Sequence, residues 1–142
     1  MSAGVARVVV VPCSGIGKSY GTVSREAAYE VTEDLRPEST RLVALSLLVL
    51  GDDDARAAVA ARPAVTIDGC KLACAAKMVR ESGGQVVREI AVLDVYRRHR
   101  EHRPQGIAEL NEGGIRLAHA VADEIAAMVD EIRSGEEAPG RA

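Results

Sequence analysis

A Rossmann-like α/β fold, a three-layer sandwich with a mainly parallel four-stranded sheet, is predicted by two features of the sequence. Apolar runs of strand length alternate with segments whose apolar residues recur at helical spacing. The order strand, helix, repeated along the chain, requires right-handed crossovers that place helices on both faces of the sheet. A chain of 142 residues, 47% of them hydrophobic, can bury such a core. We expect one domain over residues 1–133 and a flexible tail over residues 134–142.

The first two strands and their helices are predicted between the N-terminus and Pro63. Residues 5–11 form a β-branched apolar run, which is typical of a buried parallel strand. A helix is expected over residues 22–35, where apolar residues recur at helical spacing. The apolar run of residues 41–50 predicts the second strand, and the three aspartates at its end favour the start of a helix over residues 52–61.

The second half of the chain continues the same alternation. A short strand over residues 64–67 precedes a helix over residues 71–81, which ends at a Gly-Gly pair. Residues 86–95 predict the fourth strand, and the charged segment 96–104 is expected to be a solvated connection. Residues 112–133 form a long amphipathic helix whose apolar stripe is Leu117, Val121, Ile125, Met128 and Ile132. This stripe must either cover the sheet or pair with a second copy in a homodimer.

The composition excludes several classes of function. The net charge of -3, mixed charges and 2% aromatic residues give no basic surface with stacking side chains, so we expect no nucleic-acid partner. No apolar stretch approaches the roughly 20 residues of a membrane span, and the N-terminus does not resemble a signal peptide. We therefore expect a cytoplasmic protein without a membrane partner. In a reducing compartment, three cysteines are more often thiols or metal ligands than disulfides.

The three cysteines all fall at predicted strand ends or at the start of the following helix. Cys13 ends the first strand, whereas Cys70 and Cys74 lie four residues apart, on one face of a helix start. In open parallel sheets, ligands bind at the carboxyl ends of the strands. If the first and third strands are neighbours, the three sulfurs can converge as zinc or iron–sulfur ligands. Alternatively, each cysteine is a small buried apolar residue.

Three short motifs give the chain a resemblance to a known family. They are "PCSG" at residues 12–15, "IDGC" at 67–70 and "CAAK" at 74–77. On these motifs the chain resembles the DGC-domain proteins, a bacterial and archaeal family for which zinc binding has been proposed and whose biochemical role is largely unassigned. The resemblance covers most of the chain through about residue 95. It implies a metal site formed by cysteines, with zinc as the expected metal.

This chain departs from the family pattern, which has four candidate cysteines, because it has three. The missing cysteine would fall near residues 44–48, which read Ala-Leu-Ser-Leu-Leu. Three protein ligands leave a coordination position for water or substrate, whereas structural zinc sites are closed by four. The alternatives are an open zinc, an iron–sulfur cluster with one iron lacking a protein thiolate, or a site that has lost its metal.

Asp68 lies close enough in sequence to take part in this site. It is expected to be a fourth ligand, an acceptor that orients the ligands, or an N-cap of the following helix, and we favour the cap. The three histidines, His99, His102 and His119, are remote in sequence and are expected at the surface.

The glycine loop after the first strand offers a second kind of site. A Walker A loop would need glycine where the chain has Pro12, and a cysteine phosphatase would need arginine where the chain has Ser19. The backbone N–H groups of Ser14, Gly15, Ile16 and Gly17 can still bind a small anion, with Lys18 adding charge. Alternatively, the glycines only let the chain turn sharply.

Two classes of function follow. One is a metal-binding protein that carries a metal ion to an accepting protein partner. The other is a small-molecule enzyme that uses an open metal, an iron–sulfur cluster or a reactive Cys13. A thiol-redox role is a third class, although the spacing of Cys70 and Cys74 is unusual for a redox pair.

Overall fold

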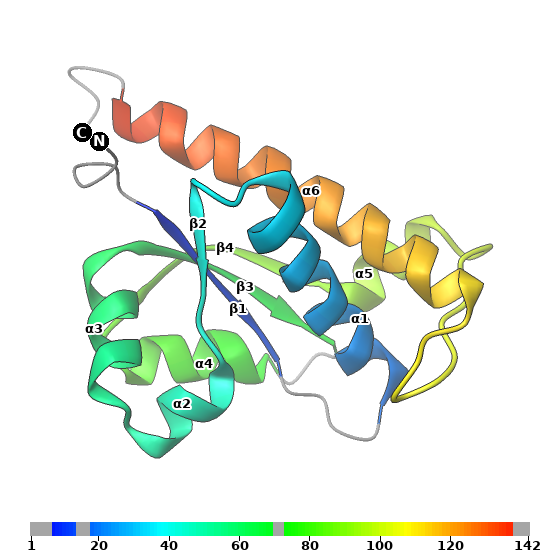
Figure 1. Ribbon diagram of the computed structural model, residues 1–142, viewed down its shortest axis with the longest axis horizontal. Coiled ribbons are helices and arrows are strands. Elements are labelled where there is room, and N and C mark those ends of the chain that lie inside the picture. The colour runs from blue at the N-terminus through cyan, green and yellow to red at the C-terminus, as the bar shows by residue number, and fades with distance from the viewer. Residues whose placement is uncertain (1–6, 14–17, 70–72, 138–142) are drawn as a thin grey trace.

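The computed structural model describes residues 7–13, 18–69 and 73–137. Four strands form one parallel sheet in the order β2-β1-β3-β4, as Figure 1 shows. The strands are β1 (Val8–Pro12), β2 (Thr40–Leu42), β3 (Pro63–Asp68) and β4 (Gln85–Ala91). The predicted α/β sandwich with a parallel four-stranded sheet is confirmed.

Helices cover both faces of this sheet. They are α1 (Ser19–Tyr29), continued by the π-helix η2 (Glu30–Leu35), α2 (Leu45–Leu50), α3 (Asp53–Ala61), α4 (Cys74–Glu81), α5 (Val92–Arg98) and α6 (Glu112–Glu137). One buried cluster joins the sheet to α1, α5 and α6, and a second joins its other face to α2, α3 and α4. Figure 1 shows the sheet between its two layers of helices, and these two clusters fill the two interfaces.

The uninterrupted apolar sequence of the central strand β1 is explained by its burial on both faces. Val8 and Val10 belong to the cluster under α1 and α6, whereas Val9 and Val11 belong to the cluster under α2 to α4. Successive strand side chains point to opposite faces, so a strand covered on both faces needs apolar residues at every position. All four valines are fully buried.

The predicted second strand over residues 41–50 is wrong beyond its first residues. Strand β2 ends at Leu42, and the leucine-rich half of the run forms helix α2. Leu45 and Leu48 are buried one helical turn apart, while Val49 and Leu50 are 64% and 80% exposed. Gly51 ends the helix in the left-handed conformation, with φ of 80°. An apolar run of this length fits a strand or a buried helix, and periodicity did not separate them.

Helix boundaries differ from the sequence predictions at several places. Helix α4 begins at Cys74 and not at the predicted residue 71, because Ala73 is in the left-handed conformation, so the predicted placement of Cys70 and Cys74 on one helix face is wrong.

Helix α1 begins three residues earlier than predicted, and its predicted last turn forms η2. The fourth strand ends at Ala91, so its predicted final residues begin α5. Helix α6 continues to Glu137, which places residues 134–137 of the predicted tail in the helix. Residues 138–142 lie outside the described part of the chain.

Helix α6 packs its apolar stripe inside its own chain. Leu117, Val121, Ile125 and Val129 are fully buried in the cluster that also contains α1 and β1. Of the two predicted uses of this stripe, the structure shows packing against the sheet layer (Figure 1). A search of the described residues for a helix with the length and apolar character of a membrane span found none.

Candidate functional site

The cysteine site predicted from the sequence lies where β1 and β3 end side by side. Pro12 pairs with Ile67 in the parallel register, and the backbone N–H of Cys13 donates to the carbonyl of Ile67 at 2.8 Å. The first and third strands are therefore neighbours, as the convergence of the cysteines requires. Cys13 and Asp68 stand at the carboxyl ends of adjacent strands, the edge where open parallel sheets bind ligands.

The Cys13 side chain is buried and its sulfur is surrounded by hydrogen-bonding groups. The backbone N–H of Gly69 donates to Sγ at 3.1 Å, and the hydroxyl of Ser24 lies 3.4 Å from the same sulfur. A donor directed at sulfur favours the negatively charged thiolate, which is the form that binds metals. The side chain is 7% exposed, so a thiolate here is largely shielded from water.

Gly69 lies so close to the first turn of α1 that a Cβ atom at this position would push against the helix backbone. A Cβ atom on Gly69 would lie 3.1 Å from the backbone nitrogen of Gly21 and 3.1 Å from the carbonyl carbon of Tyr20. Both atoms belong to the helix backbone, which cannot move aside like a flexible side chain. The glycine of the "DGC" motif therefore allows the close approach of this segment to α1 without a shift of the helix.

Asp68 is buried and holds the start of α4. Its Oδ1 accepts a hydrogen bond from the backbone N–H of Ala75 at 2.8 Å. Burial raises the pKa of this carboxyl and the charge of Glu89 adds to the rise, while hydrogen bonds from the N–H groups of Ala75 and Ala76 and the charge of Lys77 oppose it. The carboxylate satisfies an N–H group that the helix itself leaves unpaired. Asp68 makes this contact from the end of β3, whereas the N-cap position of α4 is Ala73, so the predicted N-cap of a helix beginning at Gly69 is wrong.

Cys74 is the first residue of α4 and its side chain is exposed. The residue before it, Ala73, adopts the left-handed conformation, with φ of 54° and ψ of 44°. This conformation costs a residue with a Cβ roughly 1 kcal/mol, and such strain clusters at functional sites. The contact between Asp68 and Ala75 and the turn at Ala73 together fix where α4 begins and hence where Cys74 stands.

Of the other predicted site residues, the structure describes only Lys18. Cys70, Ser14 and Gly15 lie outside the described residues. Lys18 is exposed and extended, and its carbonyl accepts hydrogen bonds from the N–H groups of Gly21 and Thr22 in the first turn of α1. Its side chain is therefore available to an anion, and binding of an anion by this loop stays a prediction.

Ser24 belongs to the site and was not predicted as a site residue. It is fully buried, its hydroxyl donates to the carbonyls of Gly21 at 2.6 Å and Cys13 at 3.2 Å, and it also contacts the Cys13 sulfur. The signal was present in the sequence, because Ser24 shares the helical stripe of Ala27, Ala28 and Val31. A polar residue on an apolar stripe must find a buried partner.

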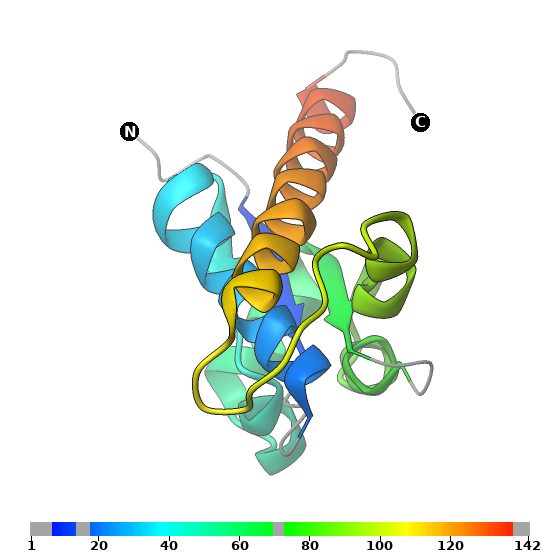
Figure 2. The same cartoon turned by 90° about the vertical axis from the view of Figure 1, so that its right-hand side faces the viewer.

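The connection between α5 and α6 lies across the first turn of α1. The Thr22 hydroxyl donates to the carbonyl of Ile107 at 2.6 Å, and the Ser19 hydroxyl reaches the carbonyl of Pro104 at 3.5 Å. Figure 2 shows this connection, in yellow, beside the start of α1. The helix turn that contacts Gly69 is thus held from a second side.

Two other features of the described residues are candidate binding regions outside the cysteine site. A surface hollow of about 830 Å³ is lined by α1, η2, the end of the α5–α6 connection and the start of α6. Its acidic lining residues are Glu26, Glu30, Glu33, Asp34 and Glu109. Cys13 is not among the lining residues of this hollow. Three potential metal-ligand side chains converge elsewhere, at His99, Glu101 and His102.

Comparison with known proteins agrees with the motifs at this sheet edge. The model of the DGC domain matches residues 9–132, which include Cys13, Cys70 and Cys74. Searches of curated proteins and of solved structures gave no significant match. The matched region extends from β1 nearly to the end of α6 and covers most of the chain. The chain belongs to the DGC-domain family.

Proposed function

We propose that this protein binds zinc through Cys13, Cys70 and Cys74 at the carboxyl edge of the sheet. The contact between the Gly69 N–H and the Cys13 sulfur is the observation that carries the proposal. It brings the chain segment directly before Cys70 against Cys13, although the two lie far apart in sequence. The contact of Asp68 with Ala75 then fixes the start of α4, the helix that carries Cys74.

The chemistry of these side chains fits a thiolate metal. Sulfur ligands favour zinc and iron–sulfur clusters over magnesium or calcium. A buried thiolate is costly unless its charge is compensated, and a bound Zn²⁺ ion would provide that compensation at Cys13. When bound, zinc supplies a Lewis acid and charge neutralisation. Asp68 acts as a positioning residue, because its carboxylate is already engaged by the N–H of Ala75.

Three thiolates leave one coordination position without a protein thiolate. The segment where the family's fourth cysteine is expected forms the connection from β2 into α2, with Ala44 before the helix and Leu45 buried within it. A three-ligand zinc keeps an exchangeable position. We infer that the metal is bound for exchange, as in a carrier that passes it to an accepting protein.

Exposure of the ligands also favours exchange. Cys74 is exposed, so a partner thiol can reach the metal from that side while Cys13 holds it from the buried side.

Lys18, exposed at the end of the glycine loop, supplies positive charge for a small anion bound with the N–H groups of Ser14 and Gly15. A cytoplasmic location belongs to the same proposal, because a reducing compartment keeps three thiols available.

Metal analysis of anaerobically purified protein tests the proposal. Inductively coupled plasma mass spectrometry should find about one zinc per chain in the wild type and a loss of most of it in Cys70→Ser and Cys74→Ser. Cys74→Ser is the cleaner variant, because an exposed side chain contributes little to folding. His119→Ala, a change of a surface ligand-type residue on α6, is the matched control and should keep the metal.

The possible results separate the alternatives. Several irons per chain, lost in the same variants, would replace zinc by an iron–sulfur cluster at the same cysteines. Protein that carries no metal, and whose uptake of Zn²⁺ under reducing conditions is the same in the wild type, Cys70→Ser and Cys74→Ser, would overturn the proposal. Cys13 would then be the residue to test for thiol reactivity.

A further inference from the structure

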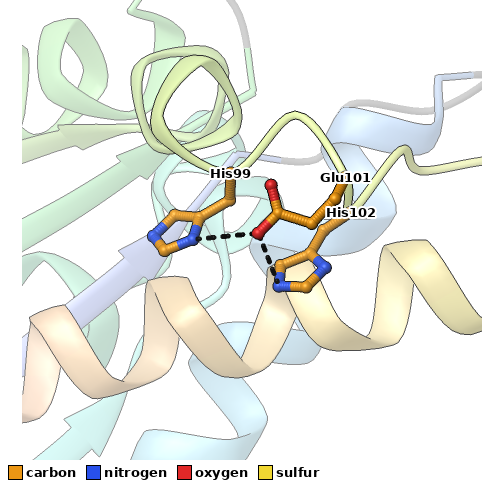
Figure 3. A group of neighbouring side chains, drawn as sticks. All are labelled: His99, Glu101 and His102. Atoms are coloured by element: carbon orange, nitrogen blue, oxygen red, sulfur yellow. Dashed lines mark ion pairs between the residues drawn. The ribbon is translucent and has the colours of Figure 1, made fainter.

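A second group of ligand-type side chains follows α5, far from the cysteines in sequence. The Nδ1 atom of His99 lies 4.0 Å from Oε2 of Glu101, and the Nε2 atom of His102 lies 3.6 Å from the same oxygen. One ligand atom from each of the three residues lies within 4.8 Å of the other two. Figure 3 shows both imidazoles directed at the carboxylate between them.

The end of α5 builds this arrangement. His99 is the C-cap of the helix, with φ of -137° and ψ of 54°, and its carbonyl accepts the N–H of His102 at 2.8 Å. This closed turn places the two rings in parallel, with an interplanar angle of 6° and centroids 5.7 Å apart. The His99 and His102 side chains are 35% and 21% exposed, so the turn partly shields them while Glu101 stays open to solvent.

We propose that His99, Glu101 and His102 form a second metal site, which takes Zn²⁺ or a similar divalent transition metal. Two imidazoles and one carboxylate are a common set of protein ligands for a zinc ion that keeps an open position. With metal–ligand bonds of about 2.0–2.2 Å, tetrahedral ligand atoms lie roughly 3.3–3.5 Å apart. The His102–Glu101 distance is close to this range, and the His99–Glu101 distance is longer. Because a metal lies in the plane of each imidazole that binds it, one of the two parallel rings must also rotate for both to bind the same ion.

The surrounding charges set the affinity of this site. Arg97 is paired with Asp94 at 3.2 Å, and Arg98 is held by Glu124 through two hydrogen bonds. These pairs neutralise part of the basic segment, whereas Arg100 and Arg103 add positive charge to it. Repulsion from these arginines weakens cation binding, so the site should bind more weakly than the cysteines and more strongly when salt screens the repulsion.

The test uses the full chain and two metals, Zn²⁺ in equilibrium dialysis and Co²⁺ in absorption spectroscopy. The double variant His99→Ala/His102→Ala should lose about one equivalent of zinc, or bind that equivalent at least tenfold more weakly. His119→Ala is the matched control, because His119 also pairs with a glutamate, Glu30, yet lies outside the cluster. The control should bind as the wild type does.

Co²⁺ spectra distinguish this site from the cysteines. Thiolate ligands give intense sulfur-to-metal charge-transfer absorption, whereas a His-His-Glu site gives weaker d–d bands without it. The d–d bands of the second equivalent should disappear in the double histidine variant and persist in Cys74→Ser. Unchanged zinc uptake in the histidine variant, or loss of all uptake in Cys74→Ser, would overturn this second site. If the cysteine proposal alone were wrong, the Co²⁺ spectrum would lack the charge-transfer bands and keep the d–d bands of the histidine site.

Discussion

The sulfur of Cys13 and the backbone N–H of Gly69 form a hydrogen bond of 3.1 Å between residues that are 56 positions apart in the sequence. Because β1 and β3 are parallel neighbours, their ends bring these residues to one edge of the sheet. The absence of a Cβ on Gly69 lets this residue lie against the first turn of α1 without displacing it. The contact therefore links the fold of the sheet to the geometry of the proposed metal site.

Gly69→Ala should disturb both stability and metal binding. The new Cβ would lie 3.1 Å from backbone atoms of Tyr20 and Gly21, closer than ordinary van der Waals contact, so the loop or α1 must shift by a few tenths of an ångström. We expect a loss of about 1–3 kcal/mol in the free energy of unfolding, measured by urea denaturation, with reduced zinc content. Gly135→Ala is the control, because nothing lies within 4 Å of its Cβ, and it should stabilise α6 by about 0.5–1 kcal/mol. Equal stability of wild type and Gly69→Ala would refute the close packing.

Asp68→Asn and Asp68→Ala separate the contact with the start of α4 from a role as metal ligand. Asparagine keeps an oxygen that accepts the N–H of Ala75, whereas alanine removes the acceptor and should cost about 1 kcal/mol relative to asparagine. Because we assign Asp68 to positioning, Asp68→Asn should keep the zinc stoichiometry of the wild type. Urea denaturation and metal analysis of both variants provide the measurement. A loss of zinc in Asp68→Asn with unchanged stability would identify Asp68 as a ligand.

Thr66→Val should stabilise the protein. Thr66 is fully buried in β3, and within the described residues its hydroxyl has no hydrogen-bond partner. Replacing an unsatisfied hydroxyl by a methyl group should raise the free energy of unfolding by about 1 kcal/mol. Thr40→Val is the matched control, because that buried hydroxyl donates to the carbonyl of Arg36 at 2.7 Å, and its loss should cost about 1 kcal/mol. Thermal or urea unfolding that ranks the two variants in the opposite order would contradict the prediction.

The ion pair between Arg36 and Asp130 should make stability depend on pH. A hydrogen bond from Arg36, followed by its charge, lowers the pKa of Asp130 below the ordinary value of 3.8. A lowered carboxyl pKa stabilises the folded state above the unfolded value, and this contribution disappears as the pH falls through the folded value. Both side chains are substantially exposed, so Asp130→Asn should cost roughly 0.3–1 kcal/mol near pH 7 at low salt.

Unfolding curves at several pH values test this ion pair. The difference between wild type and Asp130→Asn should shrink below pH 3.8 and also in high salt. Asp123→Asn removes the same charge from α6 and should change stability less. A difference that grows toward acid pH would contradict the assigned direction.

The strands of the sheet could be predicted because the sequence contains apolar runs of strand length. The long C-terminal helix could be predicted because its apolar residues recur at helical spacing. Helix α2 could not, because the run "LSLLVL" suits either element and the outcome depends on where the pairing of β2 with β1 ends, at Leu42. The placement of Cys13 and Asp68 at the same edge of the sheet was predictable, because both lie at the carboxyl ends of strands in a parallel sheet. The hydrogen bond from Gly69 to Cys13 was not, because it depends on the exact register of two distant strands.

The convergence of His99 and His102 with Glu101 is a second feature that the sequence alone could not predict. His99 and His102 were expected to be surface residues because they are remote from the cysteines, and both are indeed partly exposed. Their convergence with Glu101 depends on the turn that follows α5, which closes through the hydrogen bond between His102 and His99. The sequence shows the three residue types close together, and the backbone turn decides that their ligand atoms meet.

Zinc K-edge X-ray absorption spectroscopy on reduced protein loaded with one equivalent of Zn²⁺ tests the cysteine site most directly. We expect a first shell dominated by about three sulfur atoms near 2.3 Å, with one lighter ligand, and a reduced sulfur contribution in Cys74→Ser. A shell made of nitrogen and oxygen alone, near 2.0–2.2 Å, would contradict the cysteine site and place the metal at residues of another kind.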